Sequence, residues 1–444
     1  MRADIRWLWS RLNANYWFYP ALFSLAAAVL AFTMIYLDRA GFAEGLNQVE
    51  WIVPARPQGA SNMLTVIAGS MIGVASTVFS ITIAAVAYAS GNYGPRLLTN
   101  FMEDRGNQFS LATFIGTFVY ALIVLRSVRA EDEAASSATE AASTSLPGFV
   151  PQLSLLVAFG LMALSVAVLV YFLNHIPASI RINTVLKGIG KRLLDDIRDN
   201  YPDAASGAED EPAPDGPPAL AEATGYVQII DFDELKEAAE EAGCRIALEV
   251  RTGDFVHPGM ALAHIYEGKL DEALIDKIRT AFSIGPSRTP EQDPQFLVDE
   301  LVEIALRALS PGINDPFTAI TALHWLGAAT AELGGRDLRK RTAGNKPGER
   351  RVIPLPDDFE HFVARGFGAM RSAVATNRTT TLVMFDTLVN AASSLDDESR
   401  KAMIRREAGR LLEQARQELR GPDLQEVEAR FVVTDRALAQ AREA

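Results

Sequence analysis

The chain has 444 residues, 49% of them hydrophobic, and a formal net charge of −13. A chain of this length has room for more than one domain. The acidic balance, without a long basic run, argues against nucleic acid as a partner. The single cysteine, Cys244, excludes an intramolecular disulfide and a cysteine-based metal cluster within one chain.

Charged residues are distributed unevenly along the chain. Asp, Glu, Lys and Arg are absent between Arg56 and Arg96, from 106 to 125 and from 141 to 180, but they are dense beyond Arg181. This division predicts a mainly α fold, in which a four-helix transmembrane domain is followed by a cytosolic α+β domain. The cytosolic domain is expected to combine a small β module with a helical C-terminal part.

Four segments of the first part are long and apolar enough to span a membrane, which takes roughly 20 residues of helix. They cover about 19–37, 63–91, 109–125 and 153–174. A single soluble core rarely needs four long helices without charge. The sequence therefore predicts a transmembrane domain over residues 1–180, with the lipid bilayer as its partner.

Lys and Arg near these segments predict the orientation, because positive residues gather on the cytosolic side. Basic residues precede the first segment and follow the fourth. Those before the first are Arg2, Arg6 and Arg11, and those after the fourth are Arg181, Lys187, Lys191 and Arg192. Both termini are therefore expected in the cytosol, in a multi-pass protein of the bacterial cytoplasmic (inner) membrane. Arg126 and Arg129 run against this bias, but acidic residues follow them, and their loop is expected to be extracytoplasmic.

The second segment carries a stripe of small residues at steps of three and four. The stripe consists of Thr65, Gly69, Gly73, Ser76, Ser80, Ala84, Ala87 and Gly91. Such residues share one helix face, whereas bulky Ile67, Met71 and Val78 lie on another. A small face lets another helix approach closely.

Two interpretations of this stripe remain open. In one, it packs against other spans of the same chain. In the other, copies of the helix from several subunits surround an axis and the stripe lines a pore, with Arg96 and Asn100 at its cytosolic mouth. The four segments contain no charged residue, which argues against an ion-coupled transporter but fits a pore lined by hydroxyls and small residues.

The leading hypothesis is therefore an oligomeric, channel-like membrane protein, a homo-oligomer passing small ions, which the cytosolic domain assembles or gates. The alternative is a membrane-anchored, non-enzymatic sensor or scaffold whose spans only pack together. The sequence has no Walker, Rossmann, GxSxG or kinase motif. Its five histidines show no HExxH spacing. We expect no catalytic residue, no metal site and no enzymatic activity.

The part beyond the membrane divides by composition. We expect a connecting helix at 181–201, a flexible linker at 202–220, a small β-containing module at 221–268 and a mainly helical domain at 269–444. The linker is predicted from its Pro, Ala, Gly, Asp and Glu content. Residues 253–262 resemble the hairpin of biotinyl or lipoyl-type domains, but the carrier lysine between methionines is absent, so no cofactor is expected.

One turn in the helical part, at 310–316, has a distinctive sequence, SPGINDP. Asp315 followed by Pro316 predicts a helix start, because the carboxylate accepts from free amides and proline needs no donor there. The alternative is an ion or ligand site with Asn314 and Asp315 as oxygen ligands.

Several short segments carry a resemblance to a known family. They are FSIT at 79–82, GPRLLTNF at 94–101, GYVQ at 225–228 and ALSPGINDP at 308–316. On these segments, the chain resembles a widespread bacterial family of predicted membrane proteins that share a domain of unknown function. The resemblance extends over nearly the whole chain and implies a membrane location, without implying a particular activity.

Overall fold

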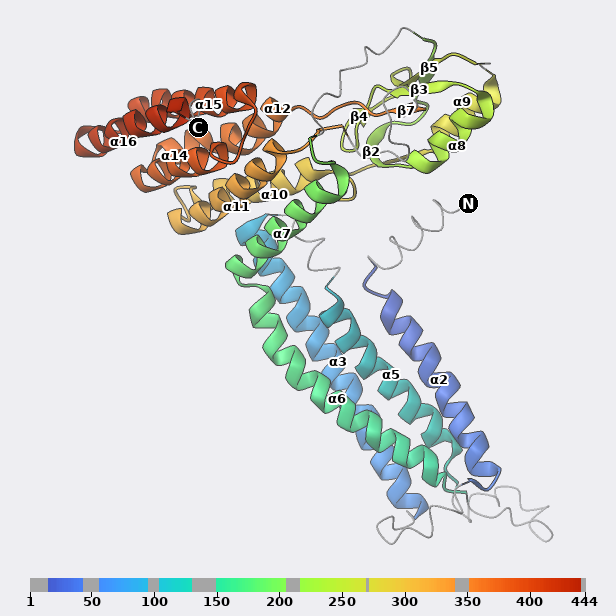
Figure 1. Ribbon diagram of the computed structural model, residues 1–444. Helices are drawn as coiled ribbons and strands as arrows, with labels where there is room; N and C mark the ends of the chain where they lie inside the picture. Colours follow the sequence, from blue (N-terminus) through green and yellow to red (C-terminus); the bar gives the residue numbers. More distant parts are fainter. Residues whose placement is uncertain are drawn as a thin grey trace, which may run out of the picture. The chain divides into compact units, whose positions relative to one another are not determined.

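The computed structural model describes residues 15–42, 56–94, 104–129, 149–204, 216–268, 271–339 and 351–440. It is mainly helical, with four apolar helices first, small sheets next and a helical C-terminal part (Figure 1). The chain divides into two compact units, Met1–Arg181 and Ile182–Ala444. We call them the membrane unit and the soluble unit. The predicted fold class is confirmed.

The membrane unit consists of four helices. They are α2 (Phe18–Arg39), α3 (Pro57–Tyr93), α5 (Arg105–Ser127) and α6 (Gln152–Ser179). Each contains one predicted segment and extends a few residues beyond it, and all four are long and apolar enough to cross a membrane. The extra residues are mostly polar, because the helices continue past the apolar stretch from which they were predicted.

Helix α5 is central and packs against α2, α3 and α6. Two polar contacts attach it to α6: the Thr117 and Ser165 hydroxyl oxygens lie 3.0 Å apart, and the Tyr120 hydroxyl donates to the Ser154 carbonyl at 3.1 Å. Polar groups inside a bilayer must find partners within the protein. These two contacts therefore favour one register of α5 against α6.

Helices that follow one another in the chain run in opposite directions, so α2 ends at the end of the unit where α6 begins (Figure 1). The Asp38 carboxylate at the end of α2 accepts from the Leu153 amide at 2.9 Å, the Ser154 amide at 2.9 Å and the Ser154 hydroxyl at 2.6 Å. A carboxylate is stabilised at a helix N-terminus, whose first amides lack partners. Asp38 therefore links α2 to α6 across more than a hundred residues.

A second carboxylate, Asp104, contacts α6 at the opposite end of the membrane unit and is partly buried. Asp104 caps α5 by accepting from the Gly106 amide at 2.8 Å, and its other oxygen lies 2.8 Å from His175 Nε2 on α6. The His175 ring stacks on Tyr171 one turn earlier. The sequence did not single out His175, whose partner is 71 residues away.

The soluble unit begins with α7 (Ile182–Asn200), close to the predicted 181–201. One face of α7 is buried against α10 (Pro294–Ala308) and α11 (Pro316–Gly334). A Cβ added at Gly190 would lie 2.2 Å from Cδ2 of Trp325. Only glycine therefore allows α7 to approach α11 this closely.

We expect Gly190→Ala to lower the free energy of unfolding by about 1–2 kcal/mol, because overpacking outweighs the better helix propensity of alanine. Gly188 on the same helix provides a matched control, since it is exposed and a Cβ there meets nothing within 4 Å. Gly188→Ala should raise stability by up to about 1 kcal/mol. Thermal unfolding of both variants measures the difference, and equal shifts would rule out the close contact with Trp325.

Two small sheets follow α7. The first has the order β1 (Pro218–Leu220), β5 (Ala261–Tyr266), β3 (Arg245–Leu248), β7 (Val352–Ile353). The second has the order β4 (Phe255–Val256), β2 (Gly225–Ile230), β6 (Phe282–Gly285). With α8 (Phe232–Ala242) and α9 (Glu272–Thr280) they share one hydrophobic core.

The β-containing part is wider than the predicted 221–268. Strand β1 lies inside the predicted linker 202–220, of which 205–215 is outside the described residues, and β6 and β7 lie inside the predicted helical part. Strands of two to four residues are too short to show a period of two. The resemblance of 253–262 to a hairpin does not extend to the strand pairing, because β4 pairs with β2 whereas β5 pairs with β1 and β3.

The remaining helices lie within the predicted, mainly helical part at 269–444. After α10 and α11 come α12 (Phe359–Val363), the π-helical turn η4 (Ala364–Gly368), α13 (Ala369–Ala375), α14 (Arg378–Ala392), α15 (Glu398–Glu418) and α16 (Gly421–Gln440). Asp or Asn side chains cap many of them, including Asp293 at α10 and Asp315 at α11. Helix α11 is central and packs against α7, α10 and α14.

Candidate functional site

Helix α3 packs within the membrane unit through one face. The buried residues of this face are Leu64, Ile67, Ala68, Met71, Ala75, Val78, Thr82, Val86 and Ala89. They contact mainly α5 and also α6. Most are bulky, so the contact is an ordinary interlocking of large side chains.

The predicted stripe lies on the other side of α3. All eight residues, from Thr65 to Gly91, are exposed in the single chain. At about 100° per residue they fall within a sector roughly 100° wide, opposite the buried face. A Cβ added at Gly69, Gly73 or Gly91 would meet nothing within 4 Å. The intramolecular packing of α3 therefore does not use the stripe.

The stripe is longer and more polar than predicted. Asn62 and Gln58, both exposed, continue it one and two turns towards the N-terminus of α3. The hydroxyls of Thr65 and Ser80 donate to carbonyls one turn back, at 2.8 and 2.9 Å. A hydroxyl that donates in this way still has lone pairs free to accept. The stripe therefore presents hydrogen-bond acceptors outwards.

Bulky apolar residues are exposed on α2, on α6 and also on α3, where Val66, Ile72, Phe79, Ile81, Ile83 and Tyr88 lie beside the stripe. On α2 the exposed residues include Leu22, Leu25, Val29, Phe32 and Tyr36, and on α6 they include Leu156, Phe159, Leu164, Val166, Val170 and Leu173. Large apolar side chains of this kind suit contact with lipid tails. The centre of the α3 stripe has only Gly, Ala and Ser over most of the span, which suits contact with another helix or with water.

The other predicted site residues are in separate places. Arg96 and Asn100, expected at a pore mouth, lie outside the described residues. Asp315 caps α11, with Oδ1 accepting from the Thr318 amide at 3.2 Å and Oδ2 from the Thr318 hydroxyl at 2.6 Å. Asn314 precedes it with a positive φ of 51°, which asparagine tolerates well. This is the capping geometry expected at the start of a helix.

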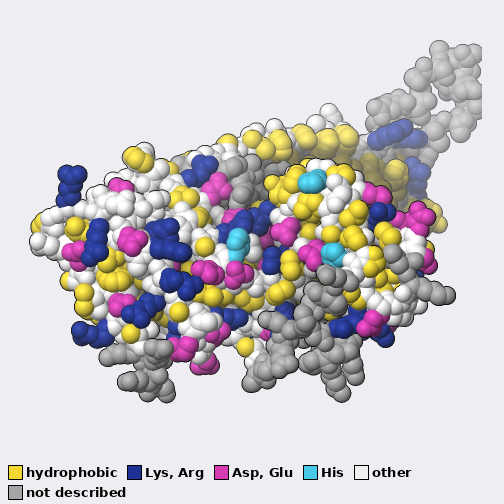
Figure 2. Space-filling view, turned by 90° about the horizontal axis from the view of Figure 1, so that it is seen from above, with side chains coloured by type: hydrophobic (Ala, Val, Ile, Leu, Met, Phe, Trp, Pro, Cys, Tyr) yellow, Lys and Arg dark blue, Asp and Glu magenta, His cyan; other side chains and the backbone are white. Residues whose placement is uncertain are grey.

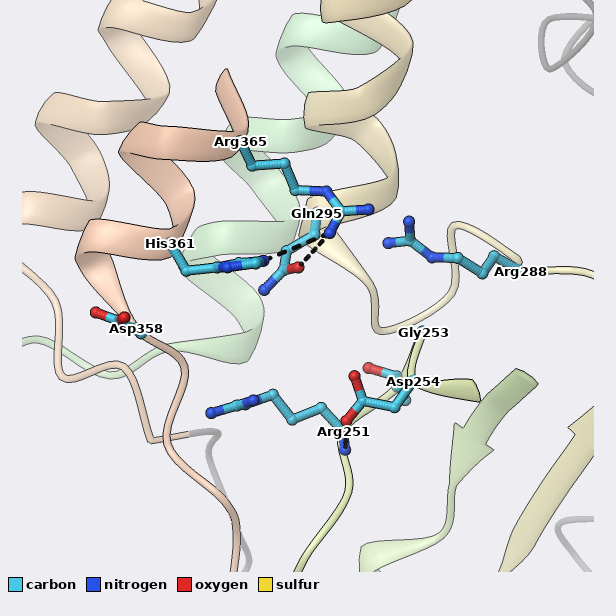
Figure 3. Close-up of a pocket in the computed structure, with 9 residues that line it drawn as sticks. Arg251, Gly253, Asp254, Arg288, Gln295, Asp358, His361 and Arg365 are labelled. Carbon is cyan, nitrogen blue, oxygen red and sulfur yellow. Dashed lines mark hydrogen bonds between the residues drawn. The ribbon is translucent and has the colours of Figure 1, made fainter. Parts of the chain in front are cut away.

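The soluble unit contains a charged cavity of about 320 Å³ between the loop before β4 and the helices α10 and α12. Its lining residues are Arg251, Thr252, Gly253, Asp254, Arg288, Gln295, Asp358, His361 and Arg365. Figure 3 shows Arg365, His361 and Gln295 pointing towards one another, with Arg251 along the opposite wall. Arg365 Nη1 lies 3.3 Å from Gln295 Oε1 and 3.4 Å from His361 Nε2.

Two of the lining arginines, Arg288 and Arg365, belong to a row of alternating charges beside the cavity. Asp299 on α10 accepts from Arg365 Nε at 2.5 Å and from Arg288 Nη1 at 2.6 Å. Arg288 also donates to the buried Asp293 at 2.7 and 2.9 Å. The hydrogen bonds to Asp299 raise the pKa of the Arg365 guanidinium above its ordinary value. We call these four residues the charge row.

The opposite wall is attached to the end of α7. The Tyr201 hydroxyl donates to Asp357 at 2.5 Å, and Arg251 Nε lies 3.4 Å from the same carboxylate. Burial and the neighbouring Asp357 carboxylate raise the pKa of Tyr201 well above its ordinary value, so its hydroxyl keeps its proton and donates. Arg251 also donates to the Pro356 carbonyl. This wall therefore joins three distant segments of the chain.

The cavity could hold a small polar ligand, but its arginines already have carboxylate or carbonyl partners. It is therefore not preformed for a multiply charged anion. Figure 2 shows the same character on a larger scale, because basic and acidic side chains are interspersed over the visible face. Among the described residues, no group of three or more His, Cys, Asp and Glu side chains is placed to hold a metal ion.

Sequence reasoning missed this cavity, although one signal was present. Asp293 precedes Pro294 just as Asp315 precedes Pro316, and both pairs start a helix. The burial of Asp293 and its pairing with Arg288 depend on the fold. The remaining lining residues lie in loops and helices with no common motif.

Comparison with known proteins identifies the family to which the chain belongs. The family model described as predicted membrane protein (DUF2254) matches residues 13–390, and so covers parts of both units. The uncharacterized proteins Mb1321c of Mycobacterium bovis and Rv1290c of Mycobacterium tuberculosis are each 29% identical to this chain, over 82% of this chain and 69% of theirs. No solved structure matches the chain. With four apolar helices that contact the lipid bilayer, the protein is a member of the DUF2254 family of predicted membrane proteins.

Proposed function

We propose that the protein is an oligomeric, channel-like membrane protein in which α3 from several subunits surrounds a pore for small ions. The observation that carries this proposal is the position of the small stripe, exposed and opposite the packed face of α3. A lipid-facing helix gains nothing from such a face. The bulky residues that lipid contact favours are exposed on α2, on α6 and on α3 beside the stripe.

The chemistry of the stripe supports small ions as the permeant species. Its hydroxyls satisfy their donors within α3 and keep acceptor lone pairs outside. Glycines next to them allow close approach of helices or of a hydrated ion. Such a pore needs no charged residue in the membrane and is gated at apolar constrictions. In this proposal the soluble unit assembles or gates the pore and has no enzymatic activity.

Cysteine accessibility tests the lining. In a Cys244→Ser background, we expect Ser76→Cys and Ser80→Cys to react with small, charged, water-soluble thiol reagents, because both face the aqueous path. Val78→Cys should not react, because Val78 is 1% exposed and packs inside the membrane unit. Val166→Cys on α6 should not react either, because it faces lipid, where the reactive thiolate does not form.

The comparison between the thiol reactivities of Ser76→Cys and Val166→Cys distinguishes water from lipid, because both side chains are exposed in the single chain. Equal protection of both in an intact oligomer would show that the stripe meets lipid or protein, and not water. The pore would then be excluded. The oligomer is monitored by size-exclusion chromatography with light scattering.

The proposal places the protein in the bacterial cytoplasmic membrane with both termini in the cytosol. The excess of Lys and Arg before α2 and after α6 supports this orientation. Alkaline phosphatase fused after Glu133 should be active, because it is exported, and fused after Lys187 it should be inactive. The reverse pattern would invert the topology.

The alternative is a membrane-anchored sensor or scaffold, non-enzymatic, whose spans only pack together. The observation that favours it is the polar cavity of the soluble unit, which has the size for a small ligand. A sensor of this kind would change the protection of α12 from hydrogen exchange on ligand binding and would leave liposomes impermeable. The channel should conduct ions in the same liposomes.

A further inference from the structure

A second cavity, of about 460 Å³, lies in the membrane unit between α2 and α5. Three of its lining side chains are apolar: Phe32, Ile35 and Ile123. Three others are basic: Arg39, Arg126 and Arg129. We call the first set the apolar wall and the second set the arginine rim. The charged cavity of the soluble unit shares no residue with this one.

The two sets are arranged along the helix axes. Helix α2 ends at Arg39 and α5 ends at Ser127, so the arginine rim lies at the ends of both spans. Phe32 is seven residues before Arg39, a rise of about 10 Å towards the middle of the membrane. The cavity is therefore apolar where lipid tails lie and cationic where headgroups lie.

The arginine rim is positioned by contacts that leave its charge available. The Arg129 backbone exchanges two hydrogen bonds with Phe149, of 3.0 and 3.1 Å, and the Arg39 guanidinium lies 5.5 Å from the centre of the Phe149 ring. None of the three forms an ion pair with a residue in the described ranges. Asp38, next to Arg39, is occupied by the N-terminus of α6.

We propose that this cavity binds an anionic phospholipid, with its phosphate within the arginine rim and an acyl chain along the apolar wall. Guanidinium groups match phosphate oxygens in charge and geometry. Isolated arginines at the ends of spans extend separately towards headgroups, whereas these three line one cavity. The proposal also explains why Arg126 and Arg129 lie on the side where the topology predicts few positive residues.

Native mass spectrometry of the full chain tests the proposal. The protein, purified in a mild detergent, is mixed with equal amounts of phosphatidylglycerol and phosphatidylcholine. The wild type should retain phosphatidylglycerol preferentially. In the Arg126→Gln/Arg129→Gln variant, retention of phosphatidylglycerol should fall by about tenfold or more, because each arginine contributes to binding of an anionic headgroup. Arg56→Gln is the matched control: Arg56 precedes α3 at the same end of the unit and does not line the cavity.

Four outcomes would overturn the proposal. An equal loss in Arg56→Gln would show diffuse attraction to surface charge, and equal retention of phosphatidylcholine would remove the preference for anionic lipid. Displacement of the lipid by millimolar inorganic phosphate would make the site one for a soluble anion. Arg126 is exposed, so the single Arg126→Gln variant should stay folded even if the double variant does not. Unchanged retention of phosphatidylglycerol by the single variant would also contradict the proposal.

Discussion

Asp299→Asn should lower the free energy of unfolding by about 3–5 kcal/mol, because it removes the central negative charge from between two arginines. Asp299 is only 13% exposed and accepts from both Arg365 and Arg288. Asparagine fits the space but leaves two partly buried guanidinium groups facing each other with one carboxylate fewer. The cost of such a change exceeds that of a surface ion pair, since water does not screen it fully.

The control for Asp299 is Asp386→Asn. Asp386 pairs with Arg430 at 2.6 Å, but both side chains are largely exposed, so the loss should stay below about 1 kcal/mol. Thermal unfolding of the full chain in detergent, followed by far-ultraviolet circular dichroism, compares the two variants. Similar shifts would mean that the charge row is solvated and that the walls of the cavity are held by other contacts.

Asp38→Ala should have an effect of similar size in the membrane unit. It removes three hydrogen bonds to a charged acceptor, two of them from the first amides of α6. Each such bond contributes about 1.5–3 kcal/mol, so we expect a loss of roughly 3 kcal/mol or more. At the end of a span few partners can replace a lost acceptor.

Thr33→Ala on the same helix is the matched control for Asp38. The Thr33 side chain is exposed and its hydroxyl donates only to the Val29 carbonyl of its own helix, so the change should be within about 0.5 kcal/mol. The stability of both variants is compared through the fraction of protein that stays monodisperse after heating. Wild-type heat resistance of Asp38→Ala would show that α6 does not need a cap from α2.

The parts of the fold that were predictable from sequence are those with local signals. Each span was found from its length without charge, and the start of α11 was found from the signal Asp315–Pro316. The stripe on α3 was identified from spacing alone. Strands β1 and β7 have two or three residues each, so their partners and not their sequences define them.

The parts that were not predictable depend on contacts between distant segments. The bond between Asp38 and the start of α6 joins residues 115 and 116 positions apart. Beside the charged cavity, Arg365 and Asp299 form a hydrogen bond although they are 66 residues apart in the sequence. A single charged residue in a sequence does not reveal its partner. The charged residues of these contacts therefore could not be distinguished, from sequence, from residues on a solvated surface.

Ion flux through reconstituted protein tests the central claim most directly. The Cys244→Ser/Ser76→Cys protein is placed in liposomes loaded with a potassium-sensitive dye, and efflux is recorded before and after a charged thiol reagent is added. We predict measurable efflux that changes when the reagent attaches a charge to Ser76→Cys, because a charge in a narrow pore alters the potential there. The Val166→Cys protein should give the same efflux with and without reagent. Liposomes that remain impermeable while the oligomer is intact would contradict the channel.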